Sequence, residues 1–419
     1  MNARRTYLFI TFSTALFFTM WSMYTGVYRV AAGLSPLQLV LLGTMLEAAV
    51  FFAEVPTGIV ADIYSRKWSI IIGLIIISCG FMLEGALPWV VTIFVAQAIW
   101  GIGYTFTSGA QDAWLAGEIG EAELGSTMLR GSQFGRIGSL VGMGVAALIA
   151  LSSSVNFALI AGGAGYLILA LVLAFQMPET GFQPADQADR STWGQMRHTF
   201  WQGWGIVKST PILLLMFAVT IFAGLGSEGI DRFWEAHLLL NFEFPQILAN
   251  NPALLNQFSG DNFSDFGPNI TLWFFIINLT ASLLSLGVTE IVRRRVAVNE
   301  DAAALRYLIV GNTIIIGAIL VFGFTFSFPA AIAAWFVLGS FRGTIGPIVG
   351  ALLNRHIRQD VRATVLSMWG QADAIGQMVS GPLMGFIVTI GPLRWAFAAV
   401  AILLAPIVLI YRRILKRHT

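Results

Sequence analysis

The chain has 419 residues, of which 57% are hydrophobic and only 11% are charged. Soluble globular proteins carry about 25% charged residues, so this composition excludes an ordinary soluble domain and predicts a membrane protein. The net charge of +2 comes from basic residues spread along the chain, and we expect no nucleic-acid partner. The single cysteine, Cys79, excludes a disulfide framework.

Twelve apolar runs are long enough to cross a bilayer as helices, since one crossing needs about 20 mostly apolar residues. In chain order they are 7–30, 38–60, 68–87, 89–112, 128–152, 155–177, 210–238, 268–292, 303–326, 329–353, 363–390 and 392–411. Membrane barrels need short alternating segments instead. We therefore expect an all-α membrane protein with twelve transmembrane helices.

The first run follows "MNARR" but is too long for a signal peptide, so we interpret it as an uncleaved helix. Most of the 24 Lys and Arg residues fall in loops on one side of the expected membrane, whereas residues 241–267 contain none. Basic loops stay in the cytoplasm. We expect a multi-pass protein of the inner (plasma) membrane with both termini in the cytoplasm.

The second run carries two acids seven residues apart, Glu47 and Glu54, which share one helix face. Burial in a bilayer favours the neutral form of a carboxyl group, so such acids can bind and release a proton. Both are candidates for proton coupling. The alternative is a structural pair with Arg136, or a polar contact to the run that begins at 363.

Further ionisable residues lie in the later runs. The stretch "SEGIDRFWEAH" places Glu228, Asp231, Arg232 and Glu235 on one stripe, where Arg232 can neutralise Glu228. Glu228 and Asp231 are therefore candidates either for proton coupling or for structural pairing. The isolated cations Arg136 and Arg342 each need an acid or a ligand. Asp373, a further proton-coupling candidate, could serve either of them.

The chain divides into two halves of six runs. Residues 177–210 form a long polar connection, and "QFGRIGSLVGM" (133–143) resembles "QADAIGQMVSG" (371–381). Internal repeats of this kind are typical of two-fold-related transporters. We expect an N-terminal bundle over 1–177, a cytoplasmic linker over 178–209 and a C-terminal bundle over 210–419.

The stretch "GIVADIYSRK" between the second and third runs resembles the loop signature of the major facilitator superfamily. The matching residues are Gly58, Ala61, Asp62, Arg66 and Lys67, whereas Ser65 replaces a glycine and Ile63 a basic residue. This resemblance implies the major facilitator fold, with two pseudo-symmetric six-helix bundles.

The resemblance also implies a cytoplasmic gate. Asp62 would meet the N-terminus of the helix that begins near 362, where a carboxylate is favoured by the helix dipole. Arg66 would pair with an acid at the end of the fourth helix, either Asp112 or Glu118. Contacts made in only one state shift the balance between two states. The alternative is that this turn only anchors the topology.

The resemblance further implies a central cavity lined by the first, fourth, seventh and tenth helices. Aromatic stripes in the first and fourth runs suit flat apolar or weakly cationic solutes, although they could instead pack against lipid or form an interfacial belt. The candidate cavity residues are Trp21, Tyr24, Gln97, Trp100, Tyr104, Arg342 and Arg136.

Two departures separate the chain from the best-known drug/proton antiporters. Gln97 stands where these often have Arg, and "GSLVG" has Ser139 in place of Pro. The sequence is more similar to the divergent drug-efflux branch that includes macrolide and tetracycline pumps.

We expect a secondary transporter, with no enzymatic activity, no cofactor and no bound metal, that exports hydrophobic or amphipathic molecules against protons. Its partners would be a small-molecule substrate, protons and the bilayer, and it would act as a monomer. The alternatives are a nutrient or lysolipid carrier on the same fold, or a non-transporting receptor.

Overall fold

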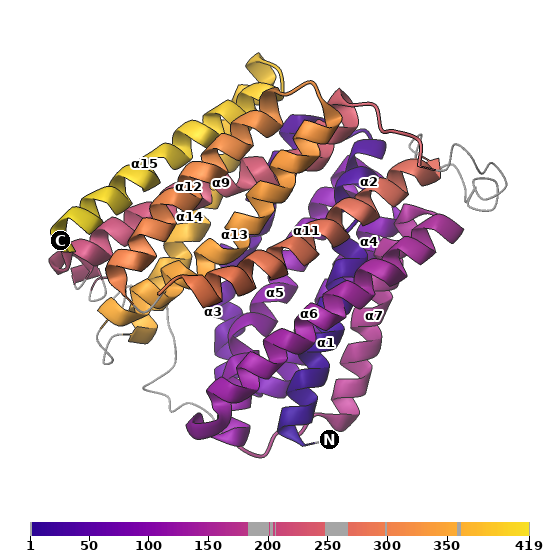
Figure 1. Ribbon diagram of the computed structural model, residues 1–419. Helices are drawn as coiled ribbons and strands as arrows, with labels where there is room; N and C mark the ends of the chain where they lie inside the picture. The colour runs from indigo at the N-terminus through magenta and orange to yellow at the C-terminus, as the bar shows by residue number, and fades with distance from the viewer. Residues whose placement is uncertain are drawn as a thin grey trace. The chain divides into compact units, whose positions relative to one another are not determined.

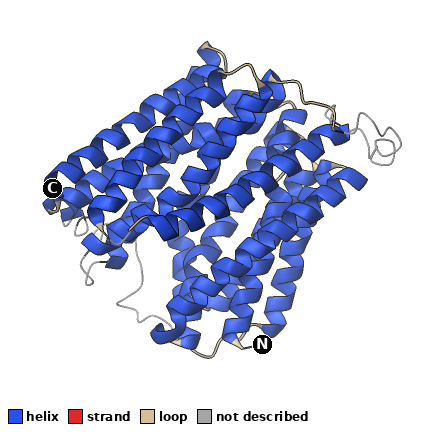
Figure 2. Cartoon of the chain, in the orientation of Figure 1, coloured by secondary structure: helices blue, strands red, loops and turns tan. Residues whose placement is uncertain are grey.

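The computed structural model describes residues 2–182, 201, 204–205, 207–247, 267–297, 300–357 and 362–418. Within these ranges the regular secondary structure is entirely helical (Figure 2). The helices (Figure 1) are α1 (Ala3–Ser22), α2 (Thr25–Ala31), α3 (Pro36–Ile63), α4 (Arg66–Ala86), α5 (Val90–Ile119), α6 (Glu121–Ser152), α7 (Val155–Gln176), α9 (Pro211–Asn241), α11 (Gly267–Arg295), α12 (Asp301–Phe324), α13 (Phe328–His356), α14 (Arg362–Ile390) and α15 (Arg394–His418).

Twelve segments of the described chain are long and apolar enough to cross a membrane. This confirms the predicted all-helical architecture. Helices α1 and α2 together form the first of these segments, Ala3–Ala31. In a bilayer a helix satisfies its own backbone hydrogen bonds, which is why apolar runs of this length become helices.

The expected start of the fifth crossing at 128 is too late, because α6 begins at Glu121. Helix α5 extends to Ile119, so a single residue, Gly120, joins the two helices. Its φ of 75° lies in the left-handed region that glycine adopts at little cost. Glycine therefore permits this sharp connection.

Residue contacts divide the chain into two compact units. Unit 1 comprises Met1–Leu34, Met45–Trp193 and Phe244–Ile276, and unit 2 comprises Ser35–Thr44, Gly194–Glu243 and Ile277–Thr419. In unit 1, α4 packs against α5 and α7, and α1 packs against α6 and α7. In unit 2, α9 packs against α14 and α15, and α12 packs against α13 and α15. The division into bundles at 177 and 210 stays a prediction.

Glycine allows the helices of unit 1 to approach closely. A Cβ atom added at Gly103 of α5 would lie 2.8 Å from the backbone nitrogen of Ile77 and 2.9 Å from the carbonyl oxygen of Gly73, both on α4. Backbone atoms cannot move aside as a flexible side chain can. Small residues at such crossings are typical of packed membrane helices.

We expect Gly103→Ala to destabilise the protein by about 1–3 kcal/mol, the usual cost of overpacking. The matched control is Gly109→Ala on the same helix, where an added Cβ would meet no atom within 4 Å. Thermal unfolding of the purified proteins in detergent measures both. Equal melting temperatures for the two variants would contradict the close α4–α5 contact.

Candidate functional site

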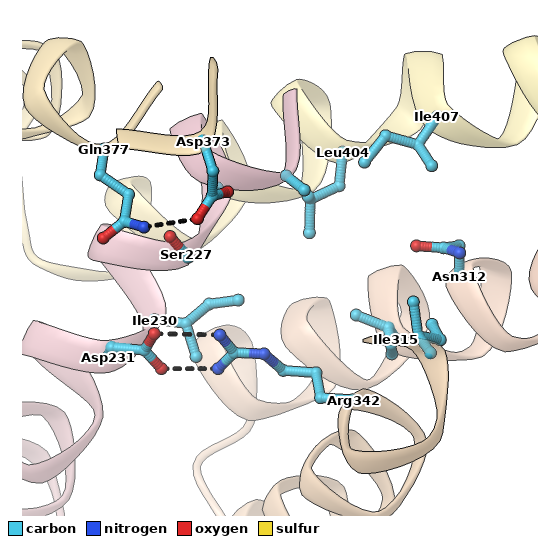
Figure 3. Close-up of a pocket in the computed structure, with 13 residues that line it drawn as sticks. Ser227, Ile230, Asp231, Asn312, Ile315, Arg342, Asp373, Gln377, Leu404 and Ile407 are labelled. Atoms are coloured by element: carbon cyan, nitrogen blue, oxygen red, sulfur yellow. Dashed lines mark hydrogen bonds and ion pairs between the residues drawn. The ribbon is translucent and has the colours of Figure 1, made fainter. Parts of the chain in front are cut away.

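A pocket of about 360 Å³ lies within unit 2, between helices α9, α12, α13, α14 and α15. Its polar lining residues are Ser227, Asp231, Asn312, Arg342, Asp373 and Gln377, and its apolar lining includes Ile230, Ile315, Ile345, Leu404 and Ile407. In Figure 3 the carboxyl groups of Asp231 and Asp373 lie at one end, whereas Asn312 and Ile407 lie at the other. The pocket thus offers both charge and aliphatic surface.

An ion pair between α9 and α13 borders this pocket. Nη1 of Arg342 donates to Oδ1 of Asp231 at 2.6 Å, and Nη2 donates to Oδ2 at 3.0 Å (Figure 3). The two side chains retain 33% and 48% of their exposure. A bidentate arginine–carboxylate pair is stronger than a single hydrogen bond and fixes the orientation of both groups. The negative charge of Asp231 is therefore matched.

Asp373 of α14 has a different environment. Its Oδ2 accepts a hydrogen bond of 2.8 Å from Nε2 of Gln377, one turn further along the same helix. No described cation forms an ion pair with it. Asp373 therefore does not serve Arg342, because Asp231 already occupies both terminal nitrogens of that arginine. A contact of Asp373 with Arg136, which belongs to unit 1, stays a prediction. Arg136 of α6 is exposed and forms no ion pair with a described residue of unit 1.

Glu228 and Arg232 form a second pair on α9, and neither residue lines the pocket. Nε of Arg232 lies 3.1 Å from Oε2 of Glu228, which confirms the predicted neutralisation within the helix. Glu228 is only 4% exposed, and a side chain at Gly43 of α3 would collide with its carboxyl group. The Glu228 charge is thus both buried and paired.

In unit 1, three carboxyl groups influence one tyrosine on α5. Glu47 and Glu54 of α3 and Asp112 of α5 all act electrostatically on the hydroxyl group of Tyr104. The tyrosine is 49% exposed, and Glu54 and Asp112 are also exposed. The alternative of a structural pair with Arg136 stays a prediction for Glu47. The two sequence-predicted acids thus occupy an acidic face together with a predicted cavity residue.

The aromatic stripe of α1 belongs largely to the core of unit 1. Trp21 is 2% exposed and stacks on Phe81, with 4.0 Å between the ring centroids. Trp100 contacts Trp21 edge-on at 4.8 Å and is half-buried. Tyr24 is fully buried and donates to the carbonyl oxygen of Thr271. Its full burial also rules out the interfacial-belt alternative for Tyr24.

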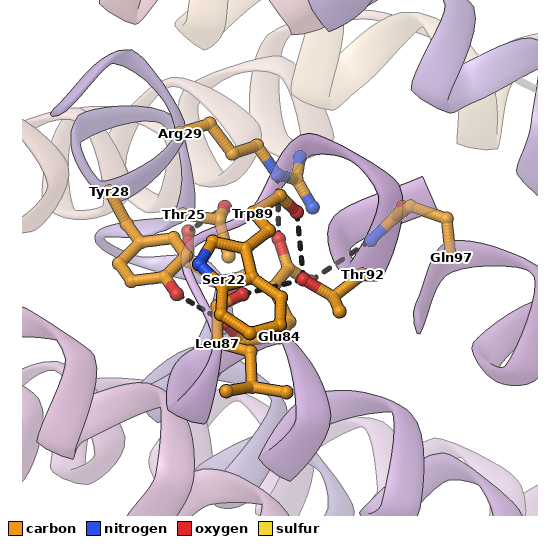
Figure 4. A network of polar contacts seen from close by, with 9 residues as sticks. All are labelled: Ser22, Thr25, Tyr28, Arg29, Glu84, Leu87, Trp89, Thr92 and Gln97. Atoms are coloured by element: carbon orange, nitrogen blue, oxygen red, sulfur yellow. Dashed lines mark hydrogen bonds and ion pairs between the residues drawn. The ribbon is translucent and has the colours of Figure 1, made fainter. Parts of the chain in front are cut away.

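Gln97 was expected to line the cavity but is fully buried. It belongs to a polar network around Glu84 of α4 (Figure 4). Nε of Arg29 lies 2.8 Å from Oε1 of Glu84, and Nε2 of Gln97 donates to Oε2 at 3.1 Å. The hydroxyl group of Tyr28 donates to the backbone carbonyl of Glu84. The network joins α2, α4 and α5.

Sequence reasoning missed Arg29 and Glu84 as a buried ion pair. In the structure the two side chains are only 6% and 0% exposed. Each lies near the end of an apolar run, where a charged residue is normally taken to reach the membrane surface. Their opposite signs at the ends of the first and third runs were the available signal. The polar pocket residues Ser227, Asn312 and Gln377 were missed because single uncharged polar residues are common in membrane helices.

The end of the loop motif Gly58–Lys67 forms hydrogen bonds with other residues of unit 1. Ser65 caps α4 by accepting a hydrogen bond from the backbone N–H of Trp68. The carboxylate of Glu179 accepts from the Ser65 hydroxyl at 2.6 Å and from the backbone N–H of Lys67 at 2.8 Å. A carboxylate at a helix N-terminus is stabilised by the free N–H groups and the helix dipole.

The expected pair of Arg66 with Asp112 or Glu118 is not formed. Nη1 of Arg66 instead donates to the carbonyl oxygen of Ala113 at 3.0 Å. Glu118 is engaged elsewhere, because its carboxylate accepts from the backbone N–H groups of Thr180 and Gly181 at 2.5 and 2.7 Å.

The other motif residues are placed as follows. Asp62 is half-buried, and its expected partner, the helix beginning at Arg362, belongs to unit 2, so that contact stays a prediction. A Cβ at Gly58 would meet no atom within 4 Å. Among the described residues, no group of three or more His, Cys, Asp or Glu side chains is arranged to hold a metal ion.

Comparison with known proteins identifies the family. Residues 7–299 match the Major Facilitator Superfamily. Because this is more than half of the sequence, the chain belongs to that superfamily of transporters. A curated relative is the "Uncharacterized MFS-type transporter YxaM" of Bacillus subtilis (strain 168), which is 22% identical over 385 residues, or 91% of this chain and 89% of the relative.

Solved structures share the fold at low sequence identity. The nucleoside transporter NupG superimposes with a TM-score of 0.71 at 15% identity, over 99% of both chains. A second neighbour is a bacterial homologue of the human lysosomal transporter Spinster, in an inward-facing and unoccupied conformation. It superimposes with a TM-score of 0.68 at 15% identity, over 98% of this chain and 95% of that one. A peptide transporter POT in complex with sulfate superimposes with a TM-score of 0.71 at 14% identity, over 99% of this chain and 94% of that one. These likenesses establish the fold but not the substrate.

We expect Glu84→Gln to destabilise unit 1 by about 3–5 kcal/mol, because it leaves the buried Arg29 guanidinium without a counter-ion. The matched control is Arg293→Gln, which breaks an exposed pair with Glu290 of the kind worth about 0–1 kcal/mol. Folded yield and melting temperature measure both. The double variant Arg29→Met with Glu84→Leu should recover much of the loss, and a single variant as stable as the parent would contradict a buried ion pair.

Proposed function

We propose that this protein is a proton-coupled secondary transporter that exports hydrophobic or amphipathic small molecules by alternating access. It would lie in the plasma membrane as a monomer with both termini in the cytoplasm. Membership of a transporter superfamily supports transport itself, and the pocket in unit 2 supports the proton coupling and the kind of solute.

The observation that carries the proposal is the unequal environment of two acids in one pocket. Asp231 is neutralised by Arg342, whereas Asp373 accepts a hydrogen bond from the neutral amide of Gln377 and forms no ion pair with a described residue of unit 2. A carboxylate without a cation in a region of low dielectric is stabilised by taking up a proton. The aliphatic side chains of Ile315, Leu404 and others offer the apolar surface that an amphipathic solute would bury.

A carrier of polar nutrients is a second candidate, and a specific observation favours it. The pocket contains the two amide side chains of Asn312 and Gln377 and the hydroxyl group of Ser227. Groups of this kind recognise hydroxyl-bearing solutes, and one structural neighbour is a nucleoside transporter. Competition of nucleosides against lipophilic dyes in the same vesicles separates the two candidates.

In everted vesicles that contain the overproduced protein, an amphipathic dye should accumulate when respiration acidifies the lumen. A protonophore should abolish this accumulation, because the proton gradient is the proposed energy source. Vesicles without the protein provide the control. Dye movement that is unchanged by the protonophore, or that also occurs without the protein, would refute proton-coupled export.

Asp62→Asn should reduce transport at least several-fold without lowering the amount of protein in the membrane, because the proposed gate depends on the charge of Asp62 at a helix N-terminus. Glu290→Gln, which removes an exposed acid paired only within α11 among the described residues, is the matched control. Full transport by the Asp62 variant would leave the loop motif as a topology anchor only.

A further inference from the structure

The pocket of unit 2 carries an unbalanced charge. The charged residues that line it are Asp231, Arg342 and Asp373, which together leave one negative charge in excess. The neighbouring pair of Glu228 and Arg232 is neutral as a pair. The excess charge therefore belongs to the pocket itself, and it is located at Asp373 because Arg342 is bound to Asp231 through both terminal nitrogens.

Among the described residues of unit 2, no cation forms an ion pair with Asp373. Its hydrogen-bond partner, Gln377, is neutral. Asp231 and Glu228 also interact electrostatically with Asp373, but each of them is paired with an arginine, so the unmatched charge remains that of Asp373. A single positive charge is therefore what the pocket lacks, and either a proton or an organic cation can supply it.

The shape of the pocket narrows the class of cation. Asp373 and Asp231 lie at one end, and Leu404 and Ile407 extend along another side (Figure 3). A hydrated metal ion would gain nothing from the aliphatic wall. A compact lipophilic ammonium ion can place its charge beside Asp373 and bury its hydrocarbon body against the isoleucine and leucine side chains.

We propose that Asp373 is a single site at which a proton and the ammonium group of a monocationic amphiphile exclude each other. This inference rests on the proposed function and assigns its coupling residue and substrate charge. Binding of the cation to the protonated pocket releases the Asp373 proton, so one positive charge replaces another. An anion of the same size is rejected when Asp373 is ionised, because the pocket then already carries one negative charge in excess.

The experiment uses three ligands with one hydrocarbon skeleton. They are the permanently charged N,N,N-trimethyl-1-adamantylammonium ion, neutral 1-adamantanol and the anion 1-adamantanecarboxylate. Binding to the purified full chain in nanodiscs is measured by calorimetry against empty nanodiscs, without any gradient. Proton release is followed with an indicator dye in weak buffer.

The cation should bind at least about tenfold more tightly than the neutral and anionic ligands at neutral or higher pH. Because the ammonium group does not titrate, any pH dependence reports the protein. As the pH is lowered into the range where Asp373 is protonated, the apparent affinity for the cation should fall by up to about tenfold for each pH unit. In the same pH range, about one proton should be released for each cation bound.

Two variants at Asp373 test whether this residue causes the cation preference and the pH dependence of binding. Asp373→Asn keeps a group that can accept from Gln377 but should lose both the cation preference and the pH dependence. Asp373→Glu should keep both, since it retains the charge. Glu290→Gln removes an acid of unit 2 outside the pocket and should behave as the parent, and melting temperatures confirm that each variant is folded.

Equal binding of the three ligands, binding of none of them, or unchanged pH dependence in Asp373→Asn would overturn the inference. Its failure is distinguishable from that of the proposed function. Protonophore-sensitive dye export together with unaltered cation binding in Asp373→Asn refutes this assignment alone. Proton release on cation binding in a protein that moves no solute in vesicles refutes the proposed transport alone.

Discussion

Charge in a medium of low dielectric constant is the constraint on which this structure depends. An unpaired charge inside a bilayer is costly, so each ionisable residue in a membrane helix needs a partner, water or a ligand. The chain satisfies this with Arg29 and Glu84 in unit 1 and with Arg232 and Glu228 in unit 2. Both pairs are largely buried. The first pair joins two helices, and the second lies within one helix.

The pocket of unit 2 differs because its charges do not cancel. Arg342 and Asp231 are paired but remain partly exposed, and among the described residues of unit 2 Asp373 is hydrogen-bonded to an amide and not to a cation. A charge imbalance that is tolerated beside a cavity is a feature that a ligand or a proton can correct. The same reasoning applies to the acidic face around Tyr104, where Glu54 and Asp112 are exposed.

The fold could be predicted from the sequence because one physical rule dominates it. Apolar runs of about 20 residues must become helices in a bilayer, and twelve such segments are observed. Helix ends were harder to place, since the early start of α6 depends on the backbone freedom of Gly120. The neutralisation of Glu228 by Arg232 was also predictable, because residues four apart on a helix must meet.

Contacts between helices far apart in the sequence could not be predicted in the same way. Nothing in the spacing of Asp231, Arg342 and Asp373 says which acid the arginine binds. The burial of Gln97 and Tyr24 likewise follows from Glu84 and Thr271, which lie on other helices. An aromatic stripe on one helix has the same appearance whether it faces a cavity or packs against a neighbour.

The segment that follows α7 has a mechanical consequence. Trp114 binds the carbonyl oxygen of Pro178, Glu118 binds the backbone of Thr180 and Gly181, and Glu179 binds the start of α4. Residues 178–181 are therefore attached by hydrogen bonds to the start of α4 and the end of α5. A displacement of the start of α4 or of the end of α5 would carry residues 178–181 with it, so this segment moves with unit 1 and not independently of it.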